Sequence, residues 1–406
     1  MLNILNQQQP KVRNSVELAD ILREYLSVFL QTHKVHSHQF KVINSIVNCR
    51  TSRLGAHVDV CDHCHHLEIS YNSCRDRHCP KCHGSKQAKW LANQIGQLLP
   101  VPYFHVVFTL PHLLNDLFIC NQKRLYNHFF KAASATLNQF AADPKYLGGK
   151  IGHIGILHTW GQNLGYHVHL HFIVSGGALS ADKTKWIQRR HSGKYLFPIK
   201  AMQAVFKGKF MELLIKDRAQ GKLIYPGDLA CMKHPVYFAD FVDKLYKLEW
   251  VMYAKKPFAG PDQVLKYIGR YTHRVAISNH RIISANDDEI CFTYKDYRDN
   301  GKRKVMRLTP VEFIRRYLQH ILPCRFVKIR HGGFLAGGYK KNLLALGAEL
   351  LKKVNSHYKI AKAKLDAVGE AIMKECIVFC PSCSIGQLRY QKEMTLQMFE
   401  FMEGIK

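Results

Sequence analysis

The stretch that decides the fold reads Tyr166-His167-Val168-His169-Leu170-His171-Phe172-Ile173-Val174. Its first half alternates histidines with apolar residues, and this period of two is typical of a β-strand. On such a strand the three imidazoles share one face, while Val168, Leu170 and Phe172 share the other. The motif by itself fits two interpretations equally well, a metal site and a solvent-facing run of histidines on an edge strand.

The composition bounds the class of protein. The chain of 406 residues is longer than a domain with one hydrophobic core usually is, so we expect two or three domains. With 59 Lys and Arg against 30 Asp and Glu, the formal net charge is +29, spread over the whole length. A field of this sign favours a polyanion, and nucleic acid is the first candidate. No apolar run approaches the ~18 residues that a bilayer requires, so no membrane partner is expected.

Cysteine usage indicates metal binding. Seven of the thirteen cysteines form two clusters, which are Cys61, Cys64, Cys74, Cys79 and Cys82, and then Cys380 and Cys383. The first fourteen residues lack the hydrophobic segment of a signal peptide, which argues against secretion. Clustered pairs without such a signal suggest metal ligands in a reducing compartment, so we expect a cytoplasmic protein.

The first cluster predicts a structural zinc site. Cys61-x2-Cys64 and Cys79-x2-Cys82 are separated by fourteen residues, a spacing typical of four thiolates around one zinc ion. Spare donors in the same region are Cys74, His57, His63 and His78. Zinc would hold the shape of this module, and basic side chains such as Arg75 and Arg77 would contact DNA. The pair Cys380-x2-Cys383 is half of a zinc site, and the sequence leaves a second metal there open.

A β-hairpin is predicted immediately before the histidine strand. The segment 161–165, Gly-Gln-Asn-Leu-Gly, has the composition of a turn between two strands. If the turn centres between Asn163 and Leu164, His158 falls opposite His169, and opposed residues point to the same face of the sheet. The residues expected to converge on one ion with open coordination positions are His158, His169 and His171, with His167 and Gln162 as competing ligands.

Two tyrosines lie on a predicted helix further along the chain. Tyr267 and Tyr271 are four residues apart, so on a helix both phenols share one face, about one turn apart. The basic residues interleaved with them are Lys266, Arg270 and Arg274. Taken alone, such tyrosines are more often core or surface aromatics than nucleophiles. A phenol with a pKa of about 10 attacks poorly until a cation or base favours the phenolate.

Several segments, taken in order, resemble the rolling-circle transposases of the insertion sequence ninety-one family, which belong to the two-tyrosine type of the HUH endonuclease superfamily. The matching segments are residues 72–82, 108–112, 157–162, 167–177, 267–279, 312–316 and 329–335. They include His-Leu-His at 169–171, followed by Phe-Ile-Val-Ser-Gly-Gly, and Tyr-Ile-Gly-Arg-Tyr at 267–271. Chance does not account for so many segments in the family's order.

The resemblance implies roles for these residues. His169 and His171 would hold a catalytic divalent ion, Mg²⁺ or Mn²⁺, and Tyr267 and Tyr271 would be the nucleophiles. The cysteine module would be the family's zinc-binding domain. The implied activity is metal-dependent cleavage and transfer of single-stranded DNA through a 5′-phosphotyrosine, which mediates rolling-circle transposition of an insertion sequence. The implied partners are single-stranded DNA and hairpin element ends, and the oligomeric state stays open.

We therefore expect an α+β fold, in which an antiparallel sheet covered by helices carries the histidines. The expected domains are a helical and zinc-binding DNA-binding domain at 1–98, an HUH catalytic domain at 99–345 and a helical extension with a cysteine pair at 346–406. Two alternatives are a replication initiator or relaxase-like nickase and a zinc-dependent DNA-binding protein without catalysis. The cysteine module and the lack of a helicase-sized extension argue against a relaxase, and the non-catalytic alternative leaves the histidine strand unexplained.

Overall fold

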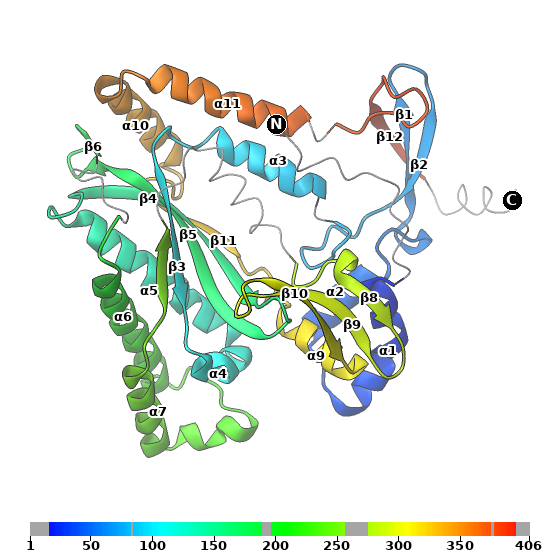
Figure 1. Ribbon diagram of the computed structural model, residues 1–406, viewed down its shortest axis with the longest axis horizontal. Coiled ribbons are helices and arrows are strands. Elements are labelled where there is room, and N and C mark those ends of the chain that lie inside the picture. The colour runs from blue at the N-terminus through cyan, green and yellow to red at the C-terminus, as the bar shows by residue number, and fades with distance from the viewer. Residues whose placement is uncertain (1–15, 83, 189–195, 256–274, 375–376, 395–406) are drawn as a thin grey trace, which may run out of the picture.

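The fold is α+β, as the sequence predicts. The computed structural model describes residues 16–82, 84–188, 196–255, 275–374 and 377–394. An antiparallel sheet runs through the centre of the molecule, helices pack on it, and two smaller sheets lie beside it (Figure 1). No helix within these described ranges is long and apolar enough to cross a membrane.

The central sheet carries the histidine strand in its middle. Its order is β11-β4-β5-β3-β7, with β6 paired to β5, and every pairing is antiparallel. The strands are β3 (Tyr103–Thr109), β4 (Gly149–Trp160), β5 (Tyr166–Ser180), β6 (Trp186–Gln188), β7 (Met252–Lys255) and β11 (Ile329–Gly333). β4 and β5 form the predicted hairpin, and His158 lies directly opposite His169. The predicted register is confirmed.

One face of this sheet is buried under an aromatic core. Val168, Leu170 and Phe172 of β5 are buried in a cluster supplied largely by four helices. These are α4 (Asn115–Cys120), α5 (Gln122–Ala142), α6 (Ile199–Ala219) and α7 (Pro235–Lys247). Phe206 of α6 packs edge-to-face on Phe108 of β3, with ring centroids 4.9 Å apart. Burial of this apolar face directs the alternate residues of β5, including its histidines, to the other side of the sheet.

That other side is partly covered by a second group of helices. Ile154, Ile156 and Ile173 pack with apolar residues of α3 (Gly84–Ile95), α10 (Lys340–Val354) and α11 (Tyr358–Lys374). α11 lies alongside α3, at the top of Figure 1. The isoleucines near the middle of β4 and β5 are thus covered, and the histidines lie nearer the hairpin turn.

A separate core joins the first helices to a later part of the chain. α1 (Leu18–Thr32) and α2 (Ser37–Val47) pack with β8 (Ile282–Ala285), β9 (Ile290–Asp296), β10 (Lys302–Leu308) and α9 (Pro310–Gln319). β8, β9 and β10 form the predicted antiparallel meander. α9 begins where the Thr309 hydroxyl accepts from the Glu312 amide at 3.3 Å and proline occupies the first turn. Apolar packing therefore crosses the domain boundary expected at residue 98.

Side chains of this second unit hold the turn of the β4–β5 hairpin. Arg281, Arg316 and His320 donate hydrogen bonds to the carbonyl oxygens of residues 162, 163 and 164, respectively. A carbonyl oxygen can only accept, so Nε2 of His320 carries the proton and Nδ1 accepts from the Thr159 hydroxyl at 3.2 Å. Burial lowers the pKa of His320 to about 4, in keeping with this neutral form. The turn is therefore fixed from outside the hairpin.

The third sheet brings together distant parts of the chain. β1 (Ala56–Cys61) is its middle strand, between β2 (Leu67–Tyr71) and β12 (Leu388–Met394). β12 runs antiparallel to β1, pairing Cys61 with Leu388 at one end and Ala56 with Met394 at the other (Figure 1). The carboxyl-terminal extension therefore returns to the amino-terminal module.

A substitution at Gly333 of β11 tests the tight contact between β11 and β4. Gly333 has a left-handed φ of +63°, and a Cβ there would lie 1.6 Å from the carbonyl oxygen of Ile151. We expect Gly333→Ala to lower the free energy of unfolding by about 3 kcal/mol, through backbone strain and collision. Gly337→Ala is the matched control, because Gly337 has a φ of +64° in open space. Its expected cost is about 1 kcal/mol. Urea denaturation followed by circular dichroism measures both, and equal losses would contradict the collision.

Candidate active site and metal centres

Three histidines converge on the polar face of the central sheet. One imidazole nitrogen from each of His158, His169 and His171 lies within 4.8 Å of the other two. The ring centroids of His158 and His171 are 4.7 Å apart, and those of His169 and His171 are 4.8 Å apart. His158 and His171 are buried, and His169 is half-buried. The hairpin thus brings together the three residues that its register predicts.

A local hydrogen bond fixes the tautomer of His169. Its Nδ1 donates to the carbonyl oxygen of His167 at 2.9 Å, so the proton resides on Nδ1 and the lone pair lies on Nε2. Burial, and secondarily the neighbouring His167, lowers the pKa of His169 to about 4. A neutral imidazole with one nitrogen fixed by a carbonyl is the form that binds a metal ion.

His105 orients a second member of the cluster, and sequence reasoning missed it. It lies on β3, and its Nε2 is 2.9 Å from Nδ1 of His171. The two rings stack at 5.2 Å with an interplanar angle of 10°. Burial lowers the pKa of His105 to about 3, so this neighbour stays neutral. No motif contains His105, and only its place in the strand beside β5 shows its role.

The two competing candidate ligands, His167 and Gln162, have different surroundings from the three converging histidines. His167 stacks on His112 at 5.2 Å and lines a separate groove with Lys244 and Lys247. It is not part of the close group of histidines. Gln162 lies in the hairpin turn, and its backbone carbonyl oxygen accepts a hydrogen bond from Arg281. The geometry therefore favours His158 as the third histidine.

Basic groups lie close to the histidine cluster. Trp160 stacks on His158 at 5.0 Å, and the ammonium of Lys328 lies over the Trp160 ring at 5.0 Å. Trp160 and Lys328 line a cavity of about 290 Å³, together with Arg77. Burial, and secondarily Arg77, lowers the pKa of Lys328 to about 7. Lys328 is therefore charged below about pH 7, and in that form a cation near the candidate metal ligands suits an anionic substrate.

The predicted nucleophiles lie outside the described residues. This applies to Tyr267 and Tyr271, and also to the basic residues Lys266, Arg270 and Arg274. Their predicted roles stay predictions. The described chain resumes at residue 275, and Val275 and Ala276 line the same cavity as Trp160.

Among the described residues, eight cysteines form two groups that could each hold a metal ion, and neither group is the one predicted. The buried cysteine cluster is Cys49, Cys74, Cys79 and Cys82, and the terminal cysteine cluster is Cys61, Cys64, Cys380 and Cys383. The prediction of one site from Cys61, Cys64, Cys79 and Cys82 is therefore corrected. The reason is the β1–β2 hairpin, which holds Cys61 and Cys64 at its turn and leaves Cys79 near its base. A strand of six residues separates tip from base by about 20 Å.

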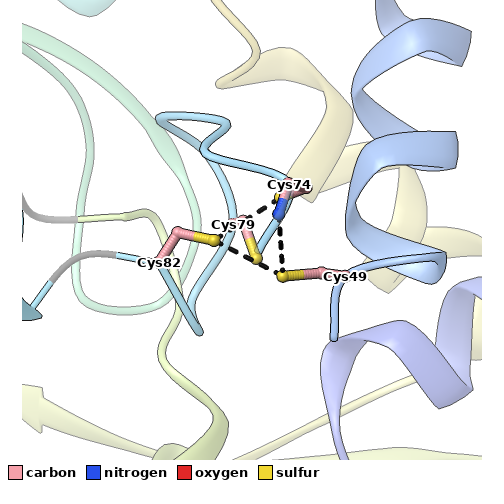
Figure 2. Close-up of side chains that lie close together, drawn as sticks. All are labelled: Cys49, Cys74, Cys79 and Cys82. Carbon is pink, nitrogen blue, oxygen red and sulfur yellow. Dashed lines mark hydrogen bonds between the residues drawn. The ribbon is translucent and has the colours of Figure 1, made fainter. Parts of the chain in front are cut away.

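The buried cysteine cluster has the geometry of a closed zinc site. Cys49 Sγ lies 3.4 Å from Cys82 Sγ, and Cys74 Sγ lies 3.6 Å from Cys82 Sγ. Figure 2 shows the four sulfurs pointing toward one another. A tetrahedral site with Zn–S bonds of about 2.3 Å has sulfurs about 3.8 Å apart, close to these distances. Burial raises the pKa of the Cys49 thiol to about 11, so a thiolate there requires a nearby cation.

Cys49 was not predicted, because it is a single cysteine in sequence. It lies just after α2, and the amide of Cys74 approaches its Sγ at 3.5 Å. Backbone hydrogen bonds bring the two segments together, since Arg50 N donates to the Asn72 carbonyl at 3.1 Å. Cys74, noted as a spare donor, thus occupies a ligand position.

The two basic residues predicted to contact DNA have different surroundings. Arg77 donates to the backbone carbonyls of Pro323 and Phe326, so its guanidinium attaches the cysteine module to the segment after α9. Tyr317 of α9 reinforces this contact by donating to the His78 carbonyl at 3.1 Å. Arg75 has an exposed side chain. Arg77 is also exposed, and its guanidinium is engaged by the carbonyls of Pro323 and Phe326.

Comparison with known proteins identifies the family. Residues 21–110 match the family described as "Transposase zinc-binding domain", and residues 152–342 match one described as "Putative transposase". The "Putative transposase y4qJ" of Sinorhizobium fredii is 41% identical over 396 residues, which cover 97% of this chain and 98% of the relative. The "Transposase for insertion sequence element IS801" of Pseudomonas savastanoi pv. phaseolicola is 28% identical over 305 residues, which cover 73% of this chain and 70% of the relative. No solved structure matches the chain.

The chain belongs to the insertion sequence ninety-one family of transposases. This confirms the resemblance seen in the sequence. Membership implies a DNA-cleaving enzyme whose partner is DNA. The zinc-binding match and the cysteine clusters together support Zn²⁺ as a cofactor.

The first prediction from these sites concerns Cys49. We expect Cys49→Ala to lose about one equivalent of zinc per chain and to lower the melting temperature, because zinc-binding free energy contributes directly to folding. Cys120→Ala is the control, since Cys120 is half-buried and belongs to neither cluster. Elemental analysis and thermal denaturation measure both effects, and an unchanged zinc content in Cys49→Ala would remove Cys49 from the site.

The second prediction concerns His105. We expect His105→Ala to weaken Mn²⁺ binding by about 10- to 100-fold, because His171 loses the partner that fixes its ring. His105→Gln should recover part of the affinity, since an amide oxygen can accept from Nδ1 of His171. Isothermal titration calorimetry measures the affinity, with His112→Ala as a control outside the cluster. Equal affinities in His105→Ala and the unmodified chain would show that the contact does not support metal binding.

Proposed function

We propose that this transposase cleaves and joins single-stranded DNA at the histidine face of its central sheet, by the two-tyrosine HUH mechanism, and so moves an insertion sequence by rolling-circle transposition. The observation that carries the proposal is the convergence of His158, His169 and His171 across the β4–β5 hairpin. Such a group beside basic side chains suits a metal ion that acts on a phosphodiester. Family membership supplies DNA as the substrate class.

The donor set fits a divalent ion. Each of the three histidines offers one nitrogen, so the described residues supply three ligands, one fewer than a closed structural zinc site has. When bound, Mg²⁺ or Mn²⁺ would polarise the scissile phosphate and stabilise the charge of the departing oxygen. Imidazole is a softer donor than the oxygens that Mg²⁺ prefers, so Mn²⁺ should support the higher activity.

Tyr267 and Tyr271 are the proposed nucleophiles. The phenolate oxygen of one tyrosine attacks the phosphorus, and the bond from phosphorus to the 3′ oxygen breaks. The products are a 5′-phosphotyrosine and a free 3′ hydroxyl. Because the ester retains the bond energy, attack by a 3′ hydroxyl on it rejoins DNA and regenerates the tyrosine. A second tyrosine, about one helical turn away, would cut another strand while the first stays attached.

Other residues of the chain bind and position the DNA. Arg75 is exposed on the cysteine module, and Lys266, Arg270 and Arg274 interleave with the tyrosines in sequence. Such cations contact phosphates without reading bases, so their loss should weaken binding to all sequences alike. Zinc in the buried cysteine cluster maintains the module that carries Arg75.

A nicking assay tests the mechanism. With a labelled single strand from an element end and Mn²⁺, we expect Tyr267→Phe with Tyr271→Phe to abolish both nicking and the covalent protein–DNA product. His169→Ala and His171→Ala should each reduce the rate by about 100-fold or more, since they remove electrostatic stabilisation of the transition state. Tyr253→Phe is the matched control, because Tyr253 is an exposed tyrosine on β7 of the same sheet.

DNA binding, measured by fluorescence anisotropy, should persist in all of these variants, because phosphate contacts come from other residues. Nicking that survives the double tyrosine change would overturn the proposed nucleophiles. Binding without nicking by the unmodified chain under any divalent metal would overturn the catalytic proposal and leave a DNA-binding protein.

A further inference from the structure

We infer that the terminal cysteine cluster, Cys61, Cys64, Cys380 and Cys383, is a second zinc site, which attaches the carboxyl-terminal segment to the amino-terminal module. The four sulfurs lie within 4.8 Å of one another, although the two pairs are more than 300 residues apart in sequence. The zinc-binding family match ends at residue 110. Half of the ligands therefore lie outside the region that this match assigns to zinc.

The distances between the sulfurs fit a shared metal ion. Cys61 Sγ lies 3.7 Å from Cys383 Sγ, and Cys64 Sγ lies 3.7 Å from Cys380 Sγ. A disulfide would bring two sulfurs to about 2.05 Å. The edge of a zinc–thiolate tetrahedron is about 3.8 Å. The cluster thus matches the tetrahedron in two independent pairs.

The two cysteine pairs have nearly equivalent backbone conformations. The residue after each pair has a left-handed φ, +58° at His65 and +55° at Ser384. The amides of these residues donate to the carbonyls of Cys61 and Cys380, at 3.2 and 2.9 Å. The same turn therefore follows both cysteine pairs, which indicates that the two pairs are halves of one binding site.

Backbone amides also point at the sulfurs. The amides of His63 and Cys64 approach Cys61 Sγ at 3.4 Å each, and the amide of Gly386 approaches Cys383 Sγ at 3.3 Å. Such donors favour the charged thiolate, which is the form that binds zinc.

Gly386 allows the two halves to approach closely. A Cβ at this position would lie 2.3 Å from Cys61 Sγ and 2.7 Å from the Cβ of His63. Beside it, the Gln387 amide donates to the Asp62 carboxylate at 2.7 Å, and Arg389 Nε donates to the same carboxylate at 3.2 Å. The halves are therefore fitted to each other by hydrogen bonds to the Asp62 carboxylate as well as by thiols.

The small sheet around this site has little apolar core of its own. The buried apolar residues shared by β1 and β12 are Ala56, Val58 and Met394, and the other residues of β12 are half-buried or exposed. A three-stranded sheet with so little burial needs another source of stability, and a structural metal is a common one in small modules. Zinc would supply it.

The position of the terminal cysteine cluster indicates a structural function. β12 pairs with β1 of the cysteine module, while α10 and α11, which precede β12, pack with isoleucines of the central sheet. Closing the terminal cysteine cluster therefore links the module to the histidine-bearing sheet through the carboxyl-terminal extension. The site would keep the two parts of the transposase in a fixed arrangement.

Zinc stoichiometry of the full-length protein tests the inference. We expect about two equivalents per chain in the unmodified protein and about one in the variant Cys380→Ser with Cys383→Ser. The control variant Cys231→Ser with Cys324→Ser should keep about two, because these exposed cysteines belong to neither cluster. A single equivalent that is lost in Cys49→Ala and kept in Cys380→Ser with Cys383→Ser would overturn the inference and leave the buried cluster as the zinc site.

Chelator kinetics give a second test, which reads the rate of zinc release. In the terminal cysteine cluster Cys64 is exposed and Cys383 is half-buried, whereas in the buried cysteine cluster Cys74 is half-buried and the other three cysteines are buried. With a chromogenic chelator, zinc should leave the unmodified protein in two phases of equal amplitude, and the faster phase should be absent from the Cys380→Ser with Cys383→Ser variant. Release in one phase with identical rates in both proteins would overturn the assignment.

Proteolysis tests the structural role. Removal of the faster equivalent should expose the carboxyl-terminal segment to trypsin while α1 and α2 stay protected. Gly386→Ala, which keeps all four thiols, should show the same exposure, and Gly208→Ala should not, since a Cβ there meets nothing within 4 Å. Unchanged cleavage after loss of the faster equivalent would overturn the attachment. None of these measurements depends on nicking, so they are separate from the test of the catalytic mechanism.

Discussion

The structure depends on the register of β4 against β5. A shift by one residue would turn every side chain of β5 to the opposite face, placing histidines in the aromatic core and Leu170 and Phe172 on the polar side. Two sets of contacts prevent it. The apolar face is buried under α5 and α6, and the turn carbonyls at 162–164 accept hydrogen bonds from Arg281, Arg316 and His320. The metal-ligand geometry follows from this register.

The histidine face is buried enough to keep the imidazoles of His169 and His105 neutral. Burial lowers the pKa of His169 to about 4 and that of His105 to about 3, so neither competes for a proton near neutral pH. Burial of an imidazole without a hydrogen-bond partner costs free energy. Here the His167 carbonyl pairs with His169 and the His105 ring pairs with His171, and these partners fix the orientation of two of the three rings. The sheet therefore presents neutral imidazoles of the kind that the proposed metal site requires, and the net positive charge of the chain favours DNA as a partner.

The cysteine clusters lie where separate parts of the chain meet. The buried cysteine cluster lies in the core that α1 and α2 share with β8, β9, β10 and α9, and Arg77 and Tyr317 attach it to the segment after α9. The terminal cysteine cluster lies where the first and last strands pair. Both are thus placed to hold the amino-terminal module against later parts of the chain, and apolar packing crosses the boundary expected at residue 98.

The sequence by itself determined the features that depend on neighbouring residues. The period of two placed three histidines on one face, and the turn at 161–165 set His158 opposite His169, because hairpin pairing follows from local backbone geometry. Only the tertiary structure decided which distant groups meet. Cysteine spacing predicted one site from Cys61, Cys64, Cys79 and Cys82, and this grouping was wrong. The path of the chain brings Cys49 and Cys74 to Cys79 and Cys82, and it brings Cys380 and Cys383 to Cys61 and Cys64. His105 has no motif, and it reaches His171 because β3 lies beside β5.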